Sequence, residues 1–563
     1  MDPPPGDASR AAPAPPGRRR DALACGALFL LASLAVGGLA PFLDRGRLSA
    51  LYYDDAFYYF QIARNVAQGH GFTFDGLHAT NGFHPLWLFV LVPVFALVPG
   101  SVPPLKAVLA LEALLVGVTV VVVFRTLRPR LGGAAAAAAA LLVVAQPMAL
   151  TVLRGGMESA LLVCLLAVAW SRWLALPEDA RPARWLELGG WCALLFLCRL
   201  EGIAAAGALL VLGRAALWRD LRRAAALLAP PVACAAAYLA WSRIAFGTWG
   251  PISTHVKRQL AQELWAGQGW TRRLLAQVLW LGGMMRGLGL RPLAAALLGL
   301  AVLAAIAVAV LSRPRQARTL VARAGAAFLL ATAAVMVGCA RVLQGMVFEW
   351  YRTPVILALA VVAGSLLHGR RLASRAVLAV AAVTCLLRAP QAWWYAGHTG
   401  GLHHLALRAA DWLHGRVSPQ RPAGCWGAGL VGYFAGNGVV NLDGFVNDAG
   451  FAREVVQQRA LAAYLEREGI VWLVDEPLPN GRPLPLQHFP EAEARAVEAR
   501  YRQVAAFAAA CPEASRCPAI AVWEVHRAAG RGETSTEVQL GPPPGEGSSS
   551  NTATKLPAAS PVK

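Results

Sequence analysis

The sequence predicts a polytopic α-helical membrane protein that carries an α/β domain near its C-terminal end. Hydrophobic residues make up 57% of the 563 residues, and charged residues only 15%. Apolar runs of about 20 residues, the length that crosses a bilayer core, recur from Leu23 to Leu387. Beyond residue 390 the pattern changes to short alternating elements with balanced charge, as in a domain that folds in water.

The formal charge of +20 does not indicate a nucleic-acid partner. Most of the excess lies in the N-terminal tail and in short Arg-rich links between apolar runs. A membrane protein keeps such links on the cytoplasmic side, so membrane topology explains the charge.

Residues 1–21 are rich in Pro, Ala and Gly and end in three arginines, which predicts a disordered cytoplasmic tail. The apolar run Leu23 to Ala40 has no A-x-A cleavage site and is followed by many more spans. We therefore expect a retained first helix that leaves the cytoplasm, in a protein of the inner (plasma) membrane.

Residues 22–388 form the predicted transmembrane domain. Leu86 to Val98 is short and interrupted by Pro93, so we treat it as an interfacial or re-entrant helix. The window count then gives about eleven spans. They are 22–41, 105–124, 132–150, 157–176, 185–200, 202–218, 224–245, 292–312, 321–340, 353–368 and 373–388.

This assignment puts the Arg-rich links on one side of the membrane, which the positive-inside rule makes cytoplasmic. The outer side then receives loop 42–104, the turn at 155–159, segments 246–291 and 344–352, and everything after 389. We expect these outer segments to build one site together.

Residues 389–529 are predicted to form the α/β domain, and 530–563 a disordered tail rich in Ser, Pro and Gly. Periodicity predicts strands at Val439 to Gly444, Ile470 to Asp475 and Ala519 to His526, and helices at Ala452 to Glu468 and Glu491 to Val504.

Two smaller features of this region bear on its function. GAGLVG at Gly427 fits the dinucleotide fingerprint, but no clear strand precedes it and a turn-like stretch follows, so a loop is favoured. Cys511 and Cys517 would pair in a disulfide only if the region is extracytoplasmic.

The long polar interval from Tyr52 to Trp87 is the best candidate for a catalytic loop. Asp54 is expected to cap a helix from about Ala56 to Gln68, with Asp55 in its first turn. Capping alone would explain both carboxylates. Asp54 also shares one helical face with Tyr58, Gln61 and Asn65, and charges beside a membrane are costly to keep without use.

The segments DDAFYYFQIARNVAQGHGFTFDG and TNGFHPLW resemble the first extracytoplasmic loop of the C-type (GT-C) glycosyltransferases, polytopic enzymes that use polyprenyl-phosphate sugars. The resemblance is strongest to the branch of the mycobacterial terminal arabinofuranosyltransferase, and protein mannosyltransferases and aminoarabinose transferases carry a related acidic pair. GGMESAL, CRLEG and FGTWGPIST follow in the order of that branch, although CRLEG departs from its Arg-Pro-Glu-Gly at Leu200.

The resemblance implies that an extracytoplasmic hydroxyl of a glycan, lipid or protein attacks a lipid-phosphate sugar with inversion. Asp54 matches the family's catalytic aspartate and is the expected general base. Asp55 and Glu158 would orient the acceptor or hold a divalent metal such as Mg or Mn, and metal dependence stays open. Membrane lipids are the other expected partner.

Candidate groups for the donor phosphate are Arg199, Lys257 and Arg352, and Asn81 is a further substrate-binding candidate. His84, a catalytic candidate, and His255 would be proton donors or hydrogen-bonding partners. Each has a structural alternative. Arg352 would snorkel at the interface, Glu201 would neutralise Arg199, and His84 would be a turn residue before Pro85.

Two other functions fit the composition. A transporter or flippase of lipid-linked sugars should carry midplane polar residues and internal repeats, but no repeat is evident. A noncatalytic cell-envelope assembly protein would keep the fold without the activity.

Overall fold

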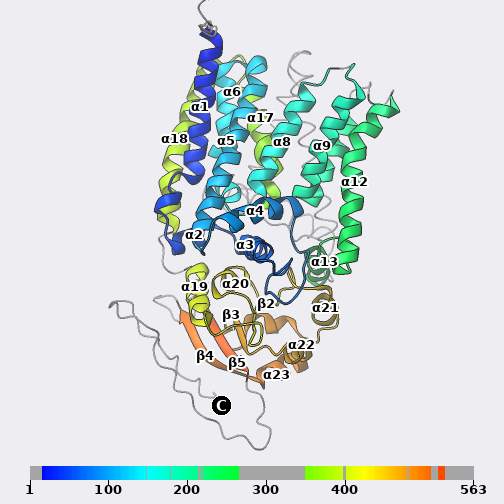
Figure 1. The fold of residues 1–563 in the computed structure, drawn as a ribbon. Helices are drawn as coiled ribbons and strands as arrows, with labels where there is room; N and C mark the ends of the chain where they lie inside the picture. Colours follow the sequence, from blue (N-terminus) through cyan, green and yellow to red (C-terminus); the bar gives the residue numbers. More distant parts are fainter. Residues whose placement is uncertain are drawn as a thin grey trace, which may run out of the picture.

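The computed structural model describes residues 16–146, 149–177, 179–212, 217, 220–264, 349–396, 401–478, 481–508 and 518–525. Figure 1 shows two layers, with long helices running side by side in the upper one and a sheet with short helices in the lower one. Helices α2 (Arg45–Leu51), α3 (Asp54–Ala67) and α4 (Pro85–Leu97) lie across the junction between them.

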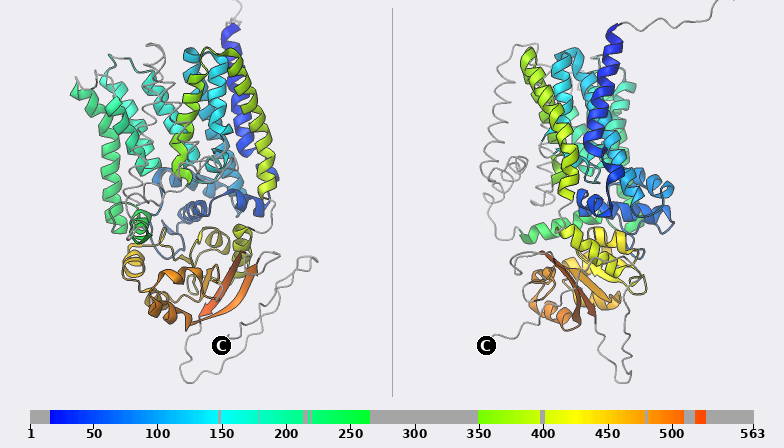
Figure 2. Two further views of the ribbon diagram at one scale, coloured as in Figure 1. Left: turned by 180° about the vertical axis from the view of Figure 1, so that it is seen from behind. Right: turned by 90° about the vertical axis from the view of Figure 1, so that its left-hand side faces the viewer.

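The upper layer is built by helices whose apolar side chains pack against one another. They are α1 (Pro16–Gly37), α5 (Pro103–Leu131), α6 (Gly133–Ala145), α7 (Ala149–Leu153), α8 (Ser159–Leu174), α9 (Pro182–Cys198), α10 (Ile203–Leu212), α12 (Leu221–Phe246), α17 (Thr353–Leu366) and α18 (Arg371–Ala396). Helix α1 packs on α5, α18 on α6, and α12 on α9. Figure 2 shows the sheet-containing layer at one end of this bundle in both views.

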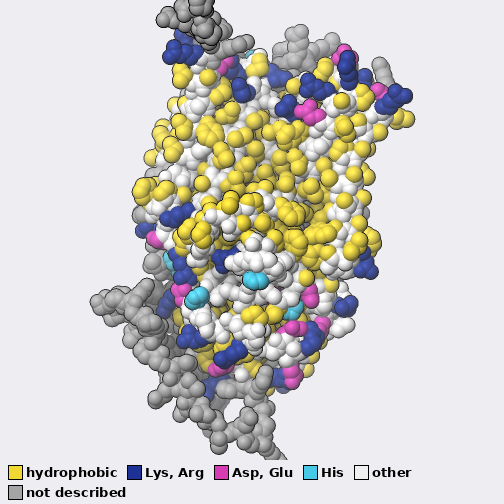
Figure 3. All heavy atoms as spheres, in the orientation of Figure 1, with side chains coloured by type: hydrophobic (Ala, Val, Ile, Leu, Met, Phe, Trp, Pro, Cys, Tyr) yellow, Lys and Arg dark blue, Asp and Glu magenta, His cyan; other side chains and the backbone are white. Residues whose placement is uncertain are grey.

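The surface of the upper layer is predominantly hydrophobic. Figure 3 shows a hydrophobic belt over these helices, with Lys and Arg gathered at its upper rim and charges of both signs over the lower layer. Three helices of the described chain are long and apolar enough to cross a membrane, namely 19–42, 103–131 and 221–246. A helical membrane protein accounts for both observations.

Some predicted boundaries were wrong. Helix α1 begins at Pro16, so residues 16–21 are helical rather than disordered, because Asp21 pairs with Arg128 and extends the helix beyond its apolar run. Helix α18 runs to Ala396, past the predicted boundary at 389. The predicted spans 292–312 and 321–340, Cys511, Cys517 and the tail 530–563 lie outside the described residues.

Several predicted spans correspond to short helices instead of membrane-length ones. The span predicted at 132–150 divides into α6 and α7, and those at 157–176 and 353–368 match α8 and α17, which have 16 and 14 residues. Helix α4 has 13 residues, as the interfacial prediction requires. The count of about eleven spans therefore stays a prediction.

The lower layer contains one five-stranded sheet. Its strands are β1 (Ala423–Cys425), β2 (Val439–Asn441), β3 (Trp472–Asp475), β4 (Tyr501–Ala508) and β5 (Ala519–Val525), in the order β2-β1-β3-β5-β4. Strand β1 runs parallel to β2 and β3, whereas β5 is antiparallel to β3 and β4. The predicted strands at 439–444, 470–475 and 519–526 are thus present as β2, β3 and β5.

The helices of this layer are α19 (Leu402–Leu413), α20 (Gly429–Ala435), α21 (Ala449–Phe451), α22 (Leu461–Arg467) and α23 (Glu491–Glu498). The helix predicted at 452–468 is broken into a π-helix, η5 (Ala452–Gln457), and α22, because Arg459 between them has φ 61°. The helix predicted at 491–504 ends at Glu498. Residues from Tyr501 form β4, since pairing with β5 outweighs their helix propensity.

A half-buried histidine connects the loop after α3 to this layer. His78 Nδ1 lies 2.6 Å from Asp75 Oδ2, and its Nε2 lies 3.2 Å from Glu468 Oε2 at the end of α22. Burial would lower the pKa of His78, but the hydrogen bond to Asp75 and the charges of Asp75, Glu468 and Asp448 raise it to about 9. The protonated ring therefore holds the loop to the domain.

This histidine should make stability fall at alkaline pH. The pKa of His78 is higher in the folded state than in the unfolded one, near 6.5, so its stabilisation is complete below that pH and is lost as the pH rises through about 9. We expect His78→Gln to remove this part of the pH dependence in thermal unfolding of the full-length protein. His414→Gln, at an exposed position, is the control. Equal pH dependence in wild type and His78→Gln would contradict the prediction.

Candidate active site

The polar face of α3 is the face that meets the sheet-containing layer. Tyr58 Oη donates to Asp443 Oδ2 over 2.6 Å, and Gln61 Nε2 donates to Asn437 Oδ1 over 2.8 Å. Asn65 turns the chain after the helix, donating to the Thr73 carbonyl over 2.9 Å. The helix ends at Ala67 with Gln68 as its C-cap, close to the predicted end at Gln68, and Gly69 follows with φ 82°. The shared face predicted from the sequence is thus a docking surface between two distant parts of the chain.

Asp54 does not cap its own helix, as the sequence had suggested. The N-cap of α3 is Tyr53, and Asp54 lies in the first turn. Its Oδ2 accepts the Gly429 N–H over 3.1 Å and its Oδ1 accepts the Leu430 N–H over 2.8 Å, both from the first turn of α20. A helix N-terminus favours a carboxylate, so Asp54 caps a helix 375 residues further along the chain.

A third carboxylate, Asp443, lies with Asp54 and Asp55. All three are half-buried. Burial raises the pKa of Asp54 to about 7, with the charges of Asp55 and Asp443 adding to it and the two α20 amides opposing it. Burial also raises the pKa of Asp55 to about 6, with Asp443 and Glu158 adding and Lys257 opposing. Carboxylates with pKa values near neutrality are suited to proton transfer.

Asp443 was missed in the sequence. It follows β2 in the LDG turn, and its Oδ1 accepts the Phe445 N–H over 2.8 Å. The signal available was an Asp-Gly pair directly after a predicted strand, where functional loops are common.

Lys257 is the basic residue that the structure brings to this group. It is half-buried on α13 (Ile252–Leu264), and its Nζ lies 4.9 Å from the centre of the Phe445 ring. Its charge lowers the pKa of Asp55, which places the two groups within electrostatic reach. The positive charge of Lys257 therefore acts on the carboxylate group.

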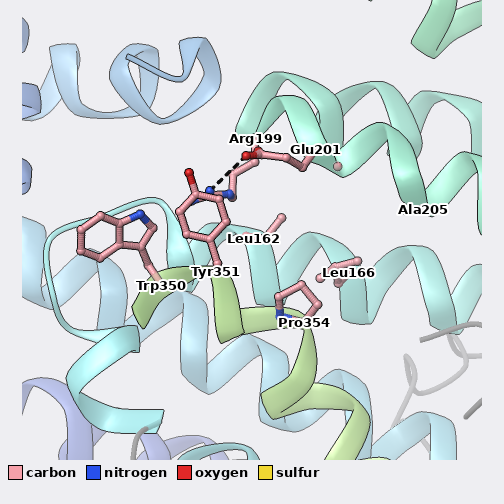
Figure 4. Close-up of a pocket in the computed structure, with 9 residues that line it drawn as sticks. Leu162, Leu166, Arg199, Glu201, Ala205, Trp350, Tyr351 and Pro354 are labelled. Atoms are coloured by element: carbon pink, nitrogen blue, oxygen red, sulfur yellow. Dashed lines mark ion pairs between the residues drawn. The ribbon is translucent and has the colours of Figure 1, made fainter. Parts of the chain in front are cut away.

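A second charged cluster lies on the membrane side. Glu158 is fully buried at the start of α8 and pairs with Arg199, which is 3% exposed. Arg199 also lies 3.5 Å from Glu201 in η2 (Leu200–Gly202) and stacks on the Tyr351 ring at 4.3 Å. Figure 4 shows the guanidinium group between the Glu201 carboxylate and this ring.

This arrangement favours the alternative in which acidic neighbours neutralise Arg199. The cavity that Arg199 lines measures about 20 Å³, room for about one water molecule. The cavity is much smaller than the sites that hold small molecules, about 300–1,000 Å³.

His84 lies beside the second cluster. Its Nε2 is 4.0 Å from Glu158 Oε1, and its backbone N–H donates to Tyr59 Oη over 3.1 Å. Burial lowers the pKa of His84, which the Glu158 charge partly offsets. A neutral imidazole at this position can accept or donate one proton.

Two other predicted residues, Asn81 and His255, are not brought to the carboxylates. Asn81 is 1% exposed, and its side-chain amide makes hydrogen bonds with Ser242, Thr248, Gly250 and Ile252. These contacts favour a role in positioning the chain over the predicted contact with substrate. His255 is exposed and bonds the Trp249 carbonyl over 3.2 Å. The backbone of Arg352 belongs to η4 (Glu349–Arg352), and its side chain lies outside the described part.

The described residues do not form a site for the predicted divalent metal. They contain no group of three or more His, Cys, Asp or Glu side chains that could hold a metal ion. One carboxylate oxygen of Glu158 is already paired with Arg199. The pair Asp55 and Glu158 thus lacks a third ligand there, and we derive no step through a metal.

The GAGLVG stretch is not the loop that the sequence suggested. It does follow a strand, β1, and it does open a helix, α20. The ligand of this helix N-terminus is the Asp54 carboxylate. A short three-residue strand and a seven-residue helix are too brief for periodicity to reveal.

Gly429 permits the close contact between α20 and α3. A Cβ atom there would lie 2.1 Å from the Asp54 carbonyl oxygen, so Gly429→Ala must move the two helices apart. We expect the free energy of unfolding to fall by about 1–3 kcal/mol, measured by thermal unfolding. Sugar-transfer activity, measured as turnover, should also fall. Gly401→Ala is the matched control, because a Cβ atom there has no atom within 4 Å. Wild-type behaviour of Gly429→Ala would rule out the tight contact.

Two family models match parts of the chain. Residues 84–249 match a family described as dolichyl-phosphate-mannose-protein mannosyltransferase. Residues 395–529 match one described as a domain of unknown function (DUF8728). Each covers less than half of the chain. Among curated proteins, none matches the chain by sequence.

Solved structures give the wider comparison. ArnT from Cupriavidus metallidurans in the apo state covers 90% of this chain and 98% of its own, with TM-score 0.54 and 15% identity. The same protein bound to undecaprenyl phosphate covers 89% of this chain and 97% of its own, with TM-score 0.52 and 14% identity. The chain has a GT-C-type membrane fold. An Archaeoglobus fulgidus oligosaccharyltransferase covers 86% of this chain and 71% of its own, with TM-score 0.48 and 14% identity. This similarity is too low to support the fold assignment.

Proposed function

We propose that the protein is a membrane glycosyltransferase that moves a sugar from a polyprenyl-phosphate donor to an acceptor hydroxyl outside the cytoplasmic membrane. The observation that carries the proposal is the group of Asp54, Asp55 and Asp443 beside Lys257, at the junction between the membrane helices and the lower layer. The fold shared with ArnT, which was solved with undecaprenyl phosphate, and the mannosyltransferase model over residues 84–249 support it. The arabinofuranosyltransferase branch stays a finer prediction.

The proposed reaction is a single displacement. The acceptor oxygen forms a bond to the anomeric carbon while the bond from that carbon to the phosphate oxygen breaks. The acceptor proton passes to Asp54, and polyprenyl phosphate leaves with the bonding electron pair, so the anomeric configuration inverts. The two α20 amides hold the Asp54 carboxylate in one orientation and stabilise its ionised form.

The other groups take supporting roles in this proposal. Asp55 orients an acceptor hydroxyl in this proposal, because an ionised carboxylate accepts hydrogen bonds from hydroxyl groups. Lys257 offsets the charge of the departing phosphate. His84, next to Glu158, supplies a hydrogen-bonding group on the membrane side of the carboxylates.

The charge distribution supports an orientation with the lower layer outside the cell. Lys and Arg gather at the rim of the hydrophobic belt that is opposite to this layer, where the positive-inside rule expects the cytoplasm. The N-terminus would then be cytoplasmic and the carboxylates extracytoplasmic. A reporter fused after residue 396 should be active only outside the cytoplasm.

The deciding experiment uses full-length protein in sealed proteoliposomes that contain a labelled polyprenyl-phosphate sugar. Transfer predicts release of polyprenyl phosphate together with label in a new product. Movement of intact donor between leaflets without product would identify a flippase instead. Neither event, in a folded preparation with several donor sugars, would favour a noncatalytic assembly protein.

A further inference from the structure

A cavity of about 450 Å³ lies beside Asp443, on the side of the lower layer and α13. This volume is within the range of small-molecule sites, about 300–1,000 Å³. The described residues that line it are Leu260, Trp426, Leu442, Asp443, Val455, Val456, Arg459, Pro485, His488 and Phe489. Except for Leu260 on α13, they all come from the lower layer.

The lining combines aromatic faces with a few polar groups. Trp426 and Phe489 are both half-buried, so their rings remain partly accessible. The Arg459 guanidinium lies 5.5 Å from the centre of the Phe489 ring, and Asp443 supplies a carboxylate. A sugar ring has apolar C–H faces and a rim of hydroxyls. It therefore matches aromatic rings beside hydrogen-bonding charges of both signs.

Backbone geometry adds a second observation. Arg459 has φ 61°, the left-handed region that residues other than glycine rarely occupy, and it lies two residues after the end of the π-helix η5. Val455 and Val456 of that π-helix also line the cavity. Strained backbone persists where the surrounding structure holds it, and such positions are common at ligand sites.

The cavity is connected to the carboxylates through Asp443. Asp443 Oδ2 accepts a hydrogen bond from the Tyr58 hydroxyl over 2.6 Å. Tyr58 lies on α3, one helical turn after Asp54 and Asp55. A ligand that reaches Asp443 from the cavity thus approaches the proposed base. None of the described lining residues belongs to a membrane helix, so the lipid-linked donor would have to leave the bilayer to occupy it.

We infer that this cavity binds the acceptor and that the acceptor is a carbohydrate, stacked on Trp426 and Phe489 with a hydroxyl directed past Asp443. The role as acceptor site rests on the proposed function. Sugar binding itself does not, because it requires neither donor nor turnover.

The test is direct binding of purified full-length protein, in lipid nanodiscs, to immobilised short neutral hexose and pentose oligosaccharides. We expect at least one of these glycans to bind wild type, and Trp426→Ala to weaken that binding on the order of tenfold. Phe489→Ala should act in the same direction and serves if Trp426→Ala does not fold. Phe507→Ala, an aromatic change on β4 outside the cavity, is the matched control.

Three results would overturn the inference: no glycan bound by folded wild type, equal binding by wild type and folded cavity variants, or cavity variants that weaken binding of polyprenyl phosphate alone. Release of polyprenyl phosphate from the donor is measured on the same preparations. Glycan binding without any release would sink the proposed function and leave the cavity assignment standing. Release with unaltered acceptor KM in Trp426→Ala and Phe489→Ala would sink the cavity assignment alone.

Discussion

Asp54→Asn should reduce transfer by about 10²–10⁴-fold, the range for removal of a general base. An amide cannot take the acceptor proton, and one of its polar atoms is a donor that would face an α20 amide. Docking of α20 is therefore disturbed as well as proton transfer. Turnover of a polyprenyl-phosphate sugar in reconstituted membranes is the measurement, with thermal unfolding to separate the two effects.

The pH profile distinguishes the two adjacent carboxylates. A base must be ionised, so wild-type kcat/KM should rise with pH through about 7, the pKa of Asp54. The Asp55 charge raises that pKa, so Asp55→Asn should keep measurable transfer and move the rise to lower pH. If Asp55→Asn abolishes transfer while Asp54→Asn only moves the rise, the base is Asp55.

Arg199→Met should destabilise the membrane half by about 3–5 kcal/mol. Glu158 is fully buried and would keep a charge without its partner. The double variant Arg199→Met with Glu158→Gln removes both charges and should recover much of the loss. The measurement is the free energy of unfolding of wild type, Arg199→Met and the double variant in the same detergent, obtained from the folded fraction.

The exposed pair Arg184 and Glu187, 3.5 Å apart, provides the control. Arg184→Met should change stability little, because an ion pair in water contributes about 0–1 kcal/mol. A stable Arg199→Met protein that loses only donor affinity would restore Arg199 as a phosphate clamp.

Part of the site could be predicted from the sequence because its residues are close together in the chain. The α3 helix, its shared polar face and its end near Gln68 all follow from spacing within one turn or two. The predicted topology placed the turn at Gly155 and the segment that contains α13 on the same side of the membrane as α3. In the structure the Tyr53 N–H bonds the Gly155 carbonyl over 3.0 Å, so one of these expected contacts is present.

The remaining contacts depend on packing between distant segments. Asp443 and the first turn of α20 reach α3 from almost 400 residues away, and no periodicity reports such a distance. The same holds for Arg199, whose pairing with Glu158 decides whether it can meet a phosphate. The sequence predicts Asn81 as a substrate-binding group, because the segment that hydrogen-bonds its amide lies 161 to 171 residues further along the chain.

The bond from Asp54 to the α20 amides also constrains how this protein can be recombined. The acidic pair belongs to the membrane half, yet one of its members is oriented by backbone groups of the other half. A chimera that exchanges residues after 400 for those of a relative must bring a glycine to position 429 and a helix that begins there. Under the proposed function, such a graft would therefore change the environment of the proposed base, Asp54, together with the proposed acceptor cavity.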